Sequence, residues 1–393
     1  MFPFNKTDLT CVAAAVGAYQ LLLAGRFWRR LRCQALSRPE AYTPSVSVIV
    51  ACKGMPRYFD QNILSLLDQD YGGDHEFVFV SPSFSDPAYR RLQILLKSRP
   101  KARTQLLHSD AVPVQCSEKI LNLLFALKRA STSREILAFA DCDVGVRRDW
   151  LRLLVAPLER PDTIAVSAPS IYAADTLNPL QVLQMAWMGT IACYMDFFGS
   201  IFGWSWAIRR KDFESAGVER AWTRSLTDDF VLNRLFKSTG KHIEWALTAM
   251  PVCTENPSLS EVLNPFVKGF KYFRAYDRPL WVAGGLEALG KLYLCLWFFR
   301  SGMPFRASLL SIVDAVTIFL IFESIRRYVP RAYESVHPVL RRCPALIAAV
   351  APILLILRVW IFIVSLWSTK IRWGGYIYQI RSADDIRVLG TTS

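Results

Sequence analysis

The sequence lacks the cysteine and histidine patterns of zinc proteins and disulfide-rich domains. Its nine cysteines contain no Cys-x-x-Cys pair, and its four histidines do not complete a zinc-ligand spacing. An odd number of unpatterned cysteines indicates reduced thiols, which favours a cytosolic location for the catalytic part. The chain also has no internal repeats and no low-complexity segment.

The first apolar run, residues 9–25, lacks the preceding positive charge of a cleavable signal peptide. A basic cluster follows the run instead, at Arg26, Arg29, Arg30 and Arg32. Because positively charged flanks stay on the cytosolic side, this order predicts a signal-anchor with the rest of the chain starting in the cytosol. We therefore interpret residues 1–43 as an N-terminal transmembrane anchor and a basic linker.

The composition indicates a membrane-associated enzyme more than a soluble one. The 393 residues are 52% hydrophobic and 13% aromatic, yet 20% are charged and the net charge is +14. This chain is too apolar for an ordinary soluble enzyme and too charged for a simple bundle of membrane spans. Many arginines flank apolar runs, which favours an anionic lipid surface over nucleic acid as the partner of the basic excess.

Residues 44–255 alternate short β-rich runs with amphipathic helical patterns. The pattern predicts a helix over residues 60–69 and strands at 46–51, 76–80, 136–140 and 163–167. Residues 202–211 are also typical of a strand that ends in a basic turn. Strand–helix–strand units build a parallel sheet, and ligands bind at the carboxyl ends of its strands. We therefore predict an α/β, Rossmann-like catalytic domain.

Residues 256–393 are dominated by apolar and aromatic runs and predict a membrane part. Residues 262–280 and 281–299 carry charges at helical spacing, as interfacial helices do, whereas 307–322 and 344–367 predict transmembrane spans. We favour two C-terminal spans, which keep the C-terminal tail on the cytosolic side with the active site but place the arginine-rich loop between the spans on the opposite side. Three spans would place that loop in the cytosol and the tail on the opposite side. Either version is a multi-pass protein, of the bacterial inner membrane or, in a eukaryote, of the Golgi or endoplasmic reticulum.

The sharpest chemical signal is Asp141-Cys142-Asp143 at the end of an apolar strand. Two carboxylates one residue apart at a strand end can face one crevice and hold Mg²⁺ or Mn²⁺, which prefer carboxylate and phosphate ligands. Such a cation would stabilise the charge on a leaving nucleoside diphosphate. The alternative is an ordinary loop tripeptide.

A second acidic signal is Thr227-Asp228-Asp229-Phe230, which leads into a helical pattern. One interpretation is a helix N-cap with favourable dipole charges. The functional interpretation is a general base, because transfer to a hydroxyl with inversion needs a carboxylate that accepts the proton. The sequence leaves both interpretations open.

Several further motifs occur in a fixed order. They are Lys53-Gly54 after the first strand, Asp86-Pro87-Ala88, Lys119-Ile120-Leu121-Asn122, the Asp141 motif, Phe202-Gly203 followed by Arg209-Arg210, and Asp228-Asp229. Their order and spacing resemble the family 2/21 glycosyltransferases of the GT-A fold, and within them most of all ceramide glucosyltransferases and bacterial hopanoid-associated relatives. The resemblance covers most of residues 44–280.

The resemblance implies roles for individual residues. Asp86 and Lys119 correspond to nucleotide-contacting residues, and Lys53 and Asp141 join them at the nucleotide-sugar. Asp143, helped by Asp141, corresponds to the metal-binding aspartate. Asp229 corresponds to the catalytic base, with Asp228 where the family usually has glutamate.

Two later motifs match less well. The family's (Gln/Arg)-x-x-Arg-Trp motif corresponds to Lys271-Tyr272-Phe273-Arg274-Ala275, which keeps the arginine for the diphosphate but lacks the tryptophan. That loss leaves the acceptor open, and we assign Trp204, Lys271 and Tyr276 to it. Arg372-Trp373-Gly374-Gly375-Tyr376 resembles the family's tail motif; the alternative is an interfacial aromatic cluster.

The sequence therefore predicts a membrane-bound inverting glycosyltransferase. Its donor would be a nucleotide-sugar, most simply UDP-linked glucose or a related hexose, and its acceptor a lipid hydroxyl such as that of ceramide. Two alternatives remain open at this stage. One is a polysaccharide synthase of the same fold, and the other is a non-catalytic nucleotide-sugar-binding membrane protein.

Overall fold

The computed structural model describes residues 6–37 and 42–392, which divide into two compact units. Among the described residues, the α/β unit comprises residues 37, 42–171, 198–255 and 369–392, and the helical unit comprises residues 6–36, 172–197 and 256–368. The C-terminal tail thus groups with the α/β unit, although the predicted membrane segments precede it in the chain. The domain boundaries predicted from the sequence, 43/44 and 255/256, remain a prediction.

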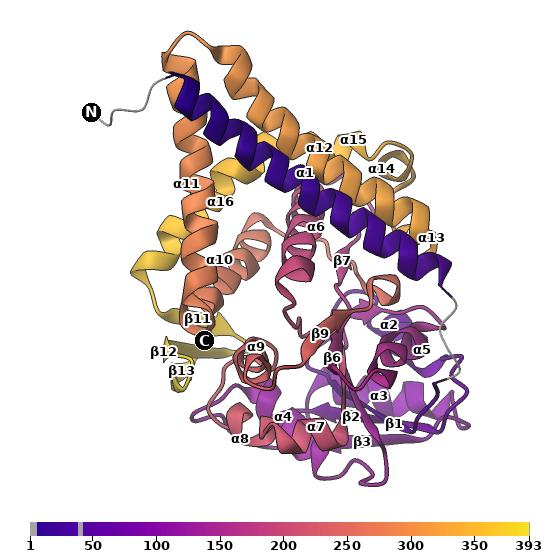
Figure 1. Cartoon of the computed structure of the whole chain (residues 1–393). Helices are drawn as coiled ribbons and strands as arrows, with labels where there is room; N and C mark the ends of the chain where they lie inside the picture. Colours follow the sequence, from indigo (N-terminus) through magenta and orange to yellow (C-terminus); the bar gives the residue numbers. More distant parts are fainter. Residues whose placement is uncertain (1–5, 38–41, 393) are drawn as a thin grey trace. The chain divides into compact units, whose positions relative to one another are not determined.

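A mixed sheet forms the centre of the α/β unit (Figure 1). Its strand order is β3-β2-β1-β4-β8-β6-β9. The strands β1 to β4 run parallel, and β8 is antiparallel to both β4 and β6. Their bounds are β1 (Val46–Ala51), β2 (His75–Ser81), β3 (Thr104–His108), β4 (Ile136–Asp141), β6 (Thr163–Ser167), β8 (Ser205–Arg209) and β9 (His242–Trp245). The predicted α/β class with a largely parallel sheet is confirmed.

Helices cover this sheet, so the strands are buried and nearly continuous in apolar residues. Val48 and Val50 of β1, Phe79 of β2 and Ala138 of β4 form one core with Trp150. The helical elements of the unit are α2 (Phe59–Leu67), α3 (Pro87–Lys97), α4 (Glu118–Leu127), α5 (Trp150–Val155), η1 (Ala156–Glu159), α7 (Arg210–Ser215), α8 (Val218–Trp222), α9 (Phe230–Lys237) and η2 (Leu247–Ala249).

Short strands add two smaller sheets. One has the order β5-β10-β7 and the other the order β11-β12-β13. Their bounds are β5 (Val144–Gly145), β7 (Ile171–Tyr172), β10 (Val252–Cys253), β11 (Lys370–Trp373), β12 (Tyr376–Ser382) and β13 (Asp385–Thr391). The sequence pattern did not predict these strands, because two-residue ladders and a hairpin tail have too few residues to show a period.

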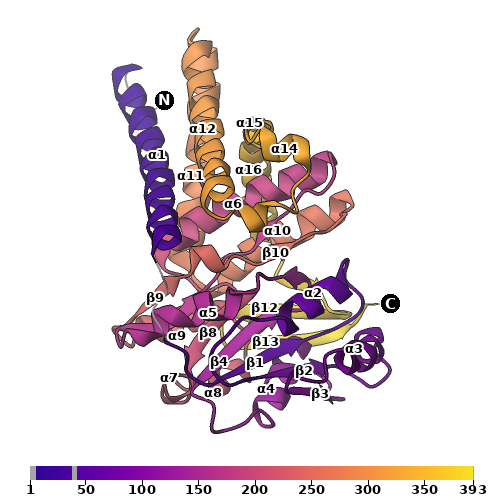
Figure 2. The same cartoon turned by 90° about the vertical axis from the view of Figure 1, so that its right-hand side faces the viewer.

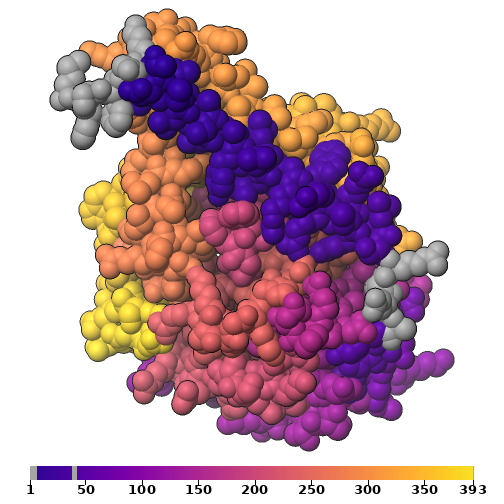
Figure 3. Space-filling model, viewed as in Figure 1, coloured from indigo at the N-terminus to yellow at the C-terminus, as the bar shows by residue number. Residues whose placement is uncertain are grey.

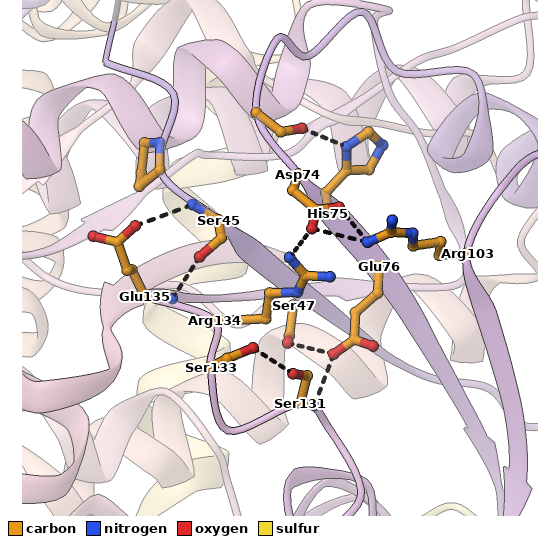
Figure 4. Close-up of polar contacts among 12 residues, drawn as sticks. Ser45, Ser47, Asp74, His75, Glu76, Arg103, Ser131, Ser133, Arg134 and Glu135 are labelled. Carbon is orange, nitrogen blue, oxygen red and sulfur yellow. Dashed lines mark hydrogen bonds and ion pairs between the residues drawn. The ribbon is translucent and has the colours of Figure 1, made fainter.

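A polar network closes the amino-terminal end of the parallel strands (Figure 4). The buried Glu76 carboxylate accepts from the Ser47 hydroxyl at 2.7 Å and from the Ser131 backbone N–H at 2.8 Å. Asp74, next to it, pairs with Arg103 and Arg134. A buried carboxylate is costly unless it is hydrogen-bonded, and these donors meet that requirement. These polar groups therefore connect the first residues of β1 and β2 to the loops that precede β3 and β4.

The helical unit contains the apolar segments. Among the described residues, three helices are long and apolar enough to cross a membrane: α1 (Lys6–Leu36), α11 (Arg278–Arg300) and α12 (Pro304–Tyr328). The remaining helices are α6 (Pro179–Phe198), α10 (Leu259–Tyr276), α13 (Pro330–Tyr333), α14 (Pro338–Arg342), α15 (Ala345–Ala348) and α16 (Ala351–Trp367). Helices α1 and α12 run side by side (Figures 2 and 3).

Helix α11 covers residues 281–299, which we predicted to be interfacial, and it is long and apolar enough to be a candidate span as well. The two charges that suggested an interfacial helix, Glu287 and Lys291, bond to each other at 2.8 Å, and Lys291 also pairs with Asp314 of α12 at 2.7 Å. The Gln20 amide of α1 donates to the same Asp314 carboxylate at 2.8 Å. Because these groups satisfy one another inside the unit, they do not require a water-facing helix.

The predicted span over residues 344–367 is divided into separate helices. Pro344 lies before α15, and Pro352 lies in the first turn of α16. Proline has no backbone N–H and favours the start of a helix over its interior, which explains the new helix start. The remaining α16 is apolar but shorter than the three candidate spans.

Gly73 gives a direct test of the packing at the start of β2. A Cβ atom there would meet the backbone carbonyl of Thr43 and, at 2.9 Å, that of Pro44, neither of which can rotate away. We expect Gly73→Ala to cost about 1–3 kcal/mol in stability. The matched control is Gly72→Ala, whose Cβ would meet only a methyl group of Thr43 at 3.5 Å and should cost under about 0.5 kcal/mol. Thermal unfolding of both variants measures the difference, and equal midpoints would contradict this packing.

Candidate active site

The candidate site lies at the carboxyl ends of β1 and β4. These strands are parallel and in register, with Ala51 opposite Asp141, so the residues that follow them lie side by side. The Asp141-Cys142-Asp143 segment connects β4 to β5, and the Asp141 N–H donates to the carbonyl of Trp204 at 3.0 Å. Strand pairing thus directs this segment to the edge of the sheet where ligands of α/β proteins bind.

A cavity of about 440 Å³ opens at this edge. Its volume is in the range of small-molecule sites. It is lined by Ala51, Cys52, Lys53, Glu118, Lys119, Asn122, Asp141, Cys142, Asp143, Trp373, Gly374, Gly375 and Tyr378. Four of the predicted site residues, Lys53, Lys119, Asp141 and Asp143, therefore share one cavity.

Lys119 joins the two acidic motifs. It lies in the first turn of α4, which begins after Ser117, whose side chain accepts from the backbone N–H of Ile120. The Lys119 ammonium contacts Asp141 at 2.7 Å and Asp228 at 3.1 Å. Burial by itself would lower the pKa of Lys119, but these carboxylates raise it above its usual value. Lys119 therefore remains charged.

The Asp228-Asp229 pair precedes α9, and Asp229 is its N-cap. One Asp229 oxygen accepts from the Phe230 N–H at 2.7 Å, so the capping interpretation is correct. Its other oxygen accepts from the Gly203 N–H at 2.9 Å. A Cβ at Gly203 would lie 3.2–3.3 Å from both carboxylates, which explains the glycine at this point of the Phe-Gly motif.

Two carboxyl groups have strongly raised pKa values. Burial raises the pKa of Asp229 to about 7, and the neighbouring charge of Asp228 adds to the effect. Burial likewise raises the pKa of Asp141 to about 7, although Lys119 acts against it. Buried carboxyl groups with pKa values near neutrality are typical of acid–base sites. Asp228 and Asp229 are not among the described residues that line the cavity. Lys119 connects them to it, because its ammonium contacts both Asp228 and the cavity residue Asp141.

Asp143 has different neighbours from Asp141. The antiparallel pair β5–β10 sets Cys253 opposite Val144, directly beside Asp143. The side-chain ligand atoms of Asp143, Cys253 and Glu255 all lie within 4.8 Å of one another. The sequence reasoning missed Cys253 and Glu255, because they are far from Asp143 in the chain and only a two-residue ladder brings them together. The predicted metal pair therefore divides: Asp141 contacts Lys119, and Asp143 lies in a mixed oxygen–sulfur cluster.

The C-terminal tail supplies one wall of the cavity. The Lys53 ammonium contacts Glu118 at 2.5 Å and donates to the Gly374 carbonyl at 2.6 Å. Gly374 and Gly375 connect β11 to β12 with φ values of +59° and +84°. A two-residue hairpin with both φ values positive strongly favours glycine. The tail motif is therefore a structural turn at the cavity, and Glu118 is a further cavity residue that the sequence did not indicate.

Two other predicted site residues lie outside this cavity lining. Asp86 is the N-cap of α3, and its carboxylate accepts from the N–H groups of Ala88 at 2.8 Å and Gly54 at 2.9 Å. It thereby fixes the turn that follows β1. The Trp204 ring stacks on Phe202 with 5.1 Å between ring centroids.

The residues of the weaker motif belong to α10 of the helical unit. The Arg274 guanidinium donates to the backbone carbonyls of Ser365 and Leu366 near the end of α16. Tyr276 is buried, and Lys271 is half-buried on the same helix. In this structure Arg274 therefore holds two helices of its own unit together.

Comparison with known proteins identifies the family. The family model for glycosyl transferase family 21 matches residues 8–386. The chain belongs to glycosyl transferase family 21. Sugar transfer and the GT-A type of fold expected from the sequence agree with this membership, and the match spans the apolar helices as well as the α/β unit. No curated protein matches the chain in sequence.

Solved structures similar to this family 21 glycosyltransferase share little sequence with it. One is mannosyltransferase PcManGT from Pyrobaculum calidifontis in complex with GDP-Man and Mn²⁺, at 15% identity and a TM-score of 0.48, covering 91% of this chain and 99% of that one. Another is S. aureus TarS, at 16% identity and a TM-score of 0.38, covering 88% and 60%. TarS 1–349 in complex with UDP-GlcNAc gives 15% identity and a TM-score of 0.38, covering 88% and 100%.

Removing Lys119 tests the electrostatics of the site. In Lys119→Ala, Asp141 and Asp228 lose their shared cation, and we expect a loss of about 3–5 kcal/mol in stability, seen as a lower thermal unfolding midpoint. Adding Asp228→Asn should recover part of the loss because one uncompensated carboxylate is removed. Lys128→Ala, at the exposed end of the same helix, is the control. If Lys119→Ala unfolds at the temperature of Lys128→Ala, the ion pairs do not stabilise the fold.

Proposed function

We propose that this family 21 glycosyltransferase transfers a hexose from a nucleotide-sugar, UDP-linked in the simplest case, to the hydroxyl of a membrane lipid such as ceramide, with inversion. The observation that carries the proposal is the Lys119 bridge, which connects a buried carboxyl pair to the carboxylate-lined cavity. Inverting transfer needs both parts together: a cavity for the diphosphate and a base for the acceptor hydroxyl.

Asp229 is the base in this proposal. Because its pKa is about 7, a large fraction of Asp229 is ionised at neutral pH, and the ionised carboxylate is a stronger base than an ordinary aspartate. Both of its oxygens accept backbone N–H groups, so its position is fixed. Asp228 beside it contacts Lys119, which supports a role in setting the charge of the base and not in taking the proton.

Cationic and carboxylate groups at the cavity suit a nucleotide-sugar. Lys53 and Lys119 supply positive charge, and Asp141 and Asp143 supply oxygen ligands. A divalent cation, Mg²⁺ or Mn²⁺, bound by Asp143 would neutralise charge on the diphosphate. Asp86 fixes the Lys53-Gly54 turn beside this cavity, which supports a contribution to nucleotide binding through the turn.

A lipid acceptor is supported by the candidate spans α1, α11 and α12 in the same chain. A membrane lipid presents its hydroxyl at headgroup height, so an enzyme that uses this acceptor must work at the membrane, and such helices would anchor it there. We assign Trp204, Lys271 and Tyr276 to acceptor recognition and Arg274 to the diphosphate, as the family resemblance implies. We further propose a multi-pass arrangement with the α/β unit in the cytosol.

Asp229→Asn tests the base. The asparagine oxygen can keep the helix cap at Phe230, and the bond from the Gly203 N–H is lost, so the variant should fold with somewhat lower stability. Its amide cannot accept the acceptor proton. We expect transfer to fall at least about 100-fold while nucleoside diphosphate binding changes little. The assay measures nucleoside diphosphate release from UDP-hexose in the presence of lipid and a divalent cation. The control is Asp68→Asn, an exposed carboxylate paired with Arg99. Full turnover in Asp229→Asn would remove the assignment.

The pH dependence of kcat gives a second test of the base. A base must be deprotonated, so the rate should fall as the pH drops through about 7, the raised pKa of Asp229. Asp228→Asn removes the neighbouring negative charge that raises this pKa, so the acidic limb of the profile should move to lower pH. An acidic limb that stays in place in this variant would show that another group controls the rate.

A further inference from the structure

Asp143, Cys253 and Glu255 form a cluster at the cavity edge, and the chemistry proposed above uses only its aspartate. The antiparallel β5–β10 pair brings the two segments together, because Cys253 lies opposite Val144 and Asp143 is the turn residue that enters β5. Glu255 follows two residues later, and alternate residues of an extended chain point to the same side. Two chain segments therefore converge here through backbone pairing.

The geometry of the cluster suits a single cation. The three ligand atoms lie within 4.8 Å of one another. Ligands on one ion, each bound at about 2.0–2.3 Å, can be at most about 4.6 Å apart, so small side-chain rotations close the site. Asp143 also lines the cavity, so an ion held here faces the space for the donor diphosphate.

The two aspartates of the Asp-x-Asp motif have different neighbours. Asp141 contacts the Lys119 ammonium at 2.7 Å, and a second cation in the same contact would be repelled. Asp143 has two other ligand-type side chains near it instead. A cation therefore has better ligands on the Cys253 side of the motif than between the two aspartates.

We propose that Cys253 is a ligand of the donor-site cation, which Asp143, Cys253 and Glu255 hold as a mixed oxygen–sulfur set. This inference rests on the proposed function for the role of the cation, but not for its binding. A thiolate is a soft ligand that suits Zn²⁺ and Co²⁺, whereas Mg²⁺ takes oxygen ligands almost alone. The site therefore selects a thiophilic divalent ion over Mg²⁺.

Cys142 provides a matched comparison. It is a buried free cysteine between the two aspartates and lines the cavity, as Cys253 is a buried free cysteine beside Asp143. Only Cys253 belongs to the three-residue cluster. Cys142→Ser and Cys253→Ser thus make the same chemical change at two neighbouring buried positions.

The test is a Co²⁺ titration of the purified full chain in detergent, followed by optical absorption. We expect a sulfur-to-cobalt charge-transfer band that Cys142→Ser retains and Cys253→Ser abolishes. Cys253→Ser and Glu255→Gln should each raise the apparent Kd for Co²⁺ at least about tenfold. Co²⁺ binding without this band, or a band lost in Cys142→Ser and kept in Cys253→Ser, overturns the proposal.

A measurement on the unmodified chain covers the case in which Cys253→Ser does not fold. X-ray absorption of the Zn²⁺-loaded protein should show a sulfur neighbour at about 2.3 Å from the metal, and a shell of oxygen and nitrogen alone overturns the proposal. The optical band and the sulfur shell need no sugar transfer. Metal–sulfur bonding without transfer would leave this inference standing and defeat the proposed function, whereas transfer without metal–sulfur bonding would do the reverse.

Discussion

The contact of Lys119 with Asp141 and Asp228 is the interaction on which the site depends. The sheet edge brings several carboxylates into a buried space, where unpaired charges are costly. One ammonium group, placed by the start of α4, links the strand-end motif to the helix-cap motif and stays protonated because of them. The same ammonium occupies the Asp141 carboxylate, so the proposed metal site uses Asp143 instead. In this proposal, one buried ion pair gives the two aspartates of the Asp-x-Asp motif different roles.

The helical unit meets a similar constraint in apolar surroundings. Glu287, Lys291 and Asp314 lie on helices that are apolar enough to cross a membrane, and their charges pair with one another. Ionisable groups in such segments persist when they face partners inside the bundle. Both units therefore use internal pairing to keep charges that their surroundings disfavour. In the α/β unit the paired charges surround a cavity, and in the helical unit they join α11 to α12 and α1.

Much of this could be predicted from the sequence, for identifiable reasons. The strands at residues 46–51, 136–140 and 163–167 have continuous apolar runs with clear ends, so their positions and the α/β class were predictable. The antiparallel β8 was expected only as a strand, since pairing direction leaves no local pattern. Cys253 and Glu255 were missed because a two-residue ladder brings their segment to Asp143. Glu118 was missed because its partner Lys53 is 65 residues away in the chain. The prediction of an interfacial helix at residues 281–299 used the charges alone, because a sequence shows charges but not their partners.

The most direct test of the central claim is an experimental structure of the full chain with a nucleoside diphosphate and Mn²⁺. The account predicts density for the diphosphate and the ion in the cavity at the ends of β1 and β4, with the ion on Asp143 and Lys119 still bridging Asp141 and Asp228. A nucleotide bound elsewhere on the α/β unit, or an ion between Asp141 and Asp143 with Lys119 displaced, would contradict it.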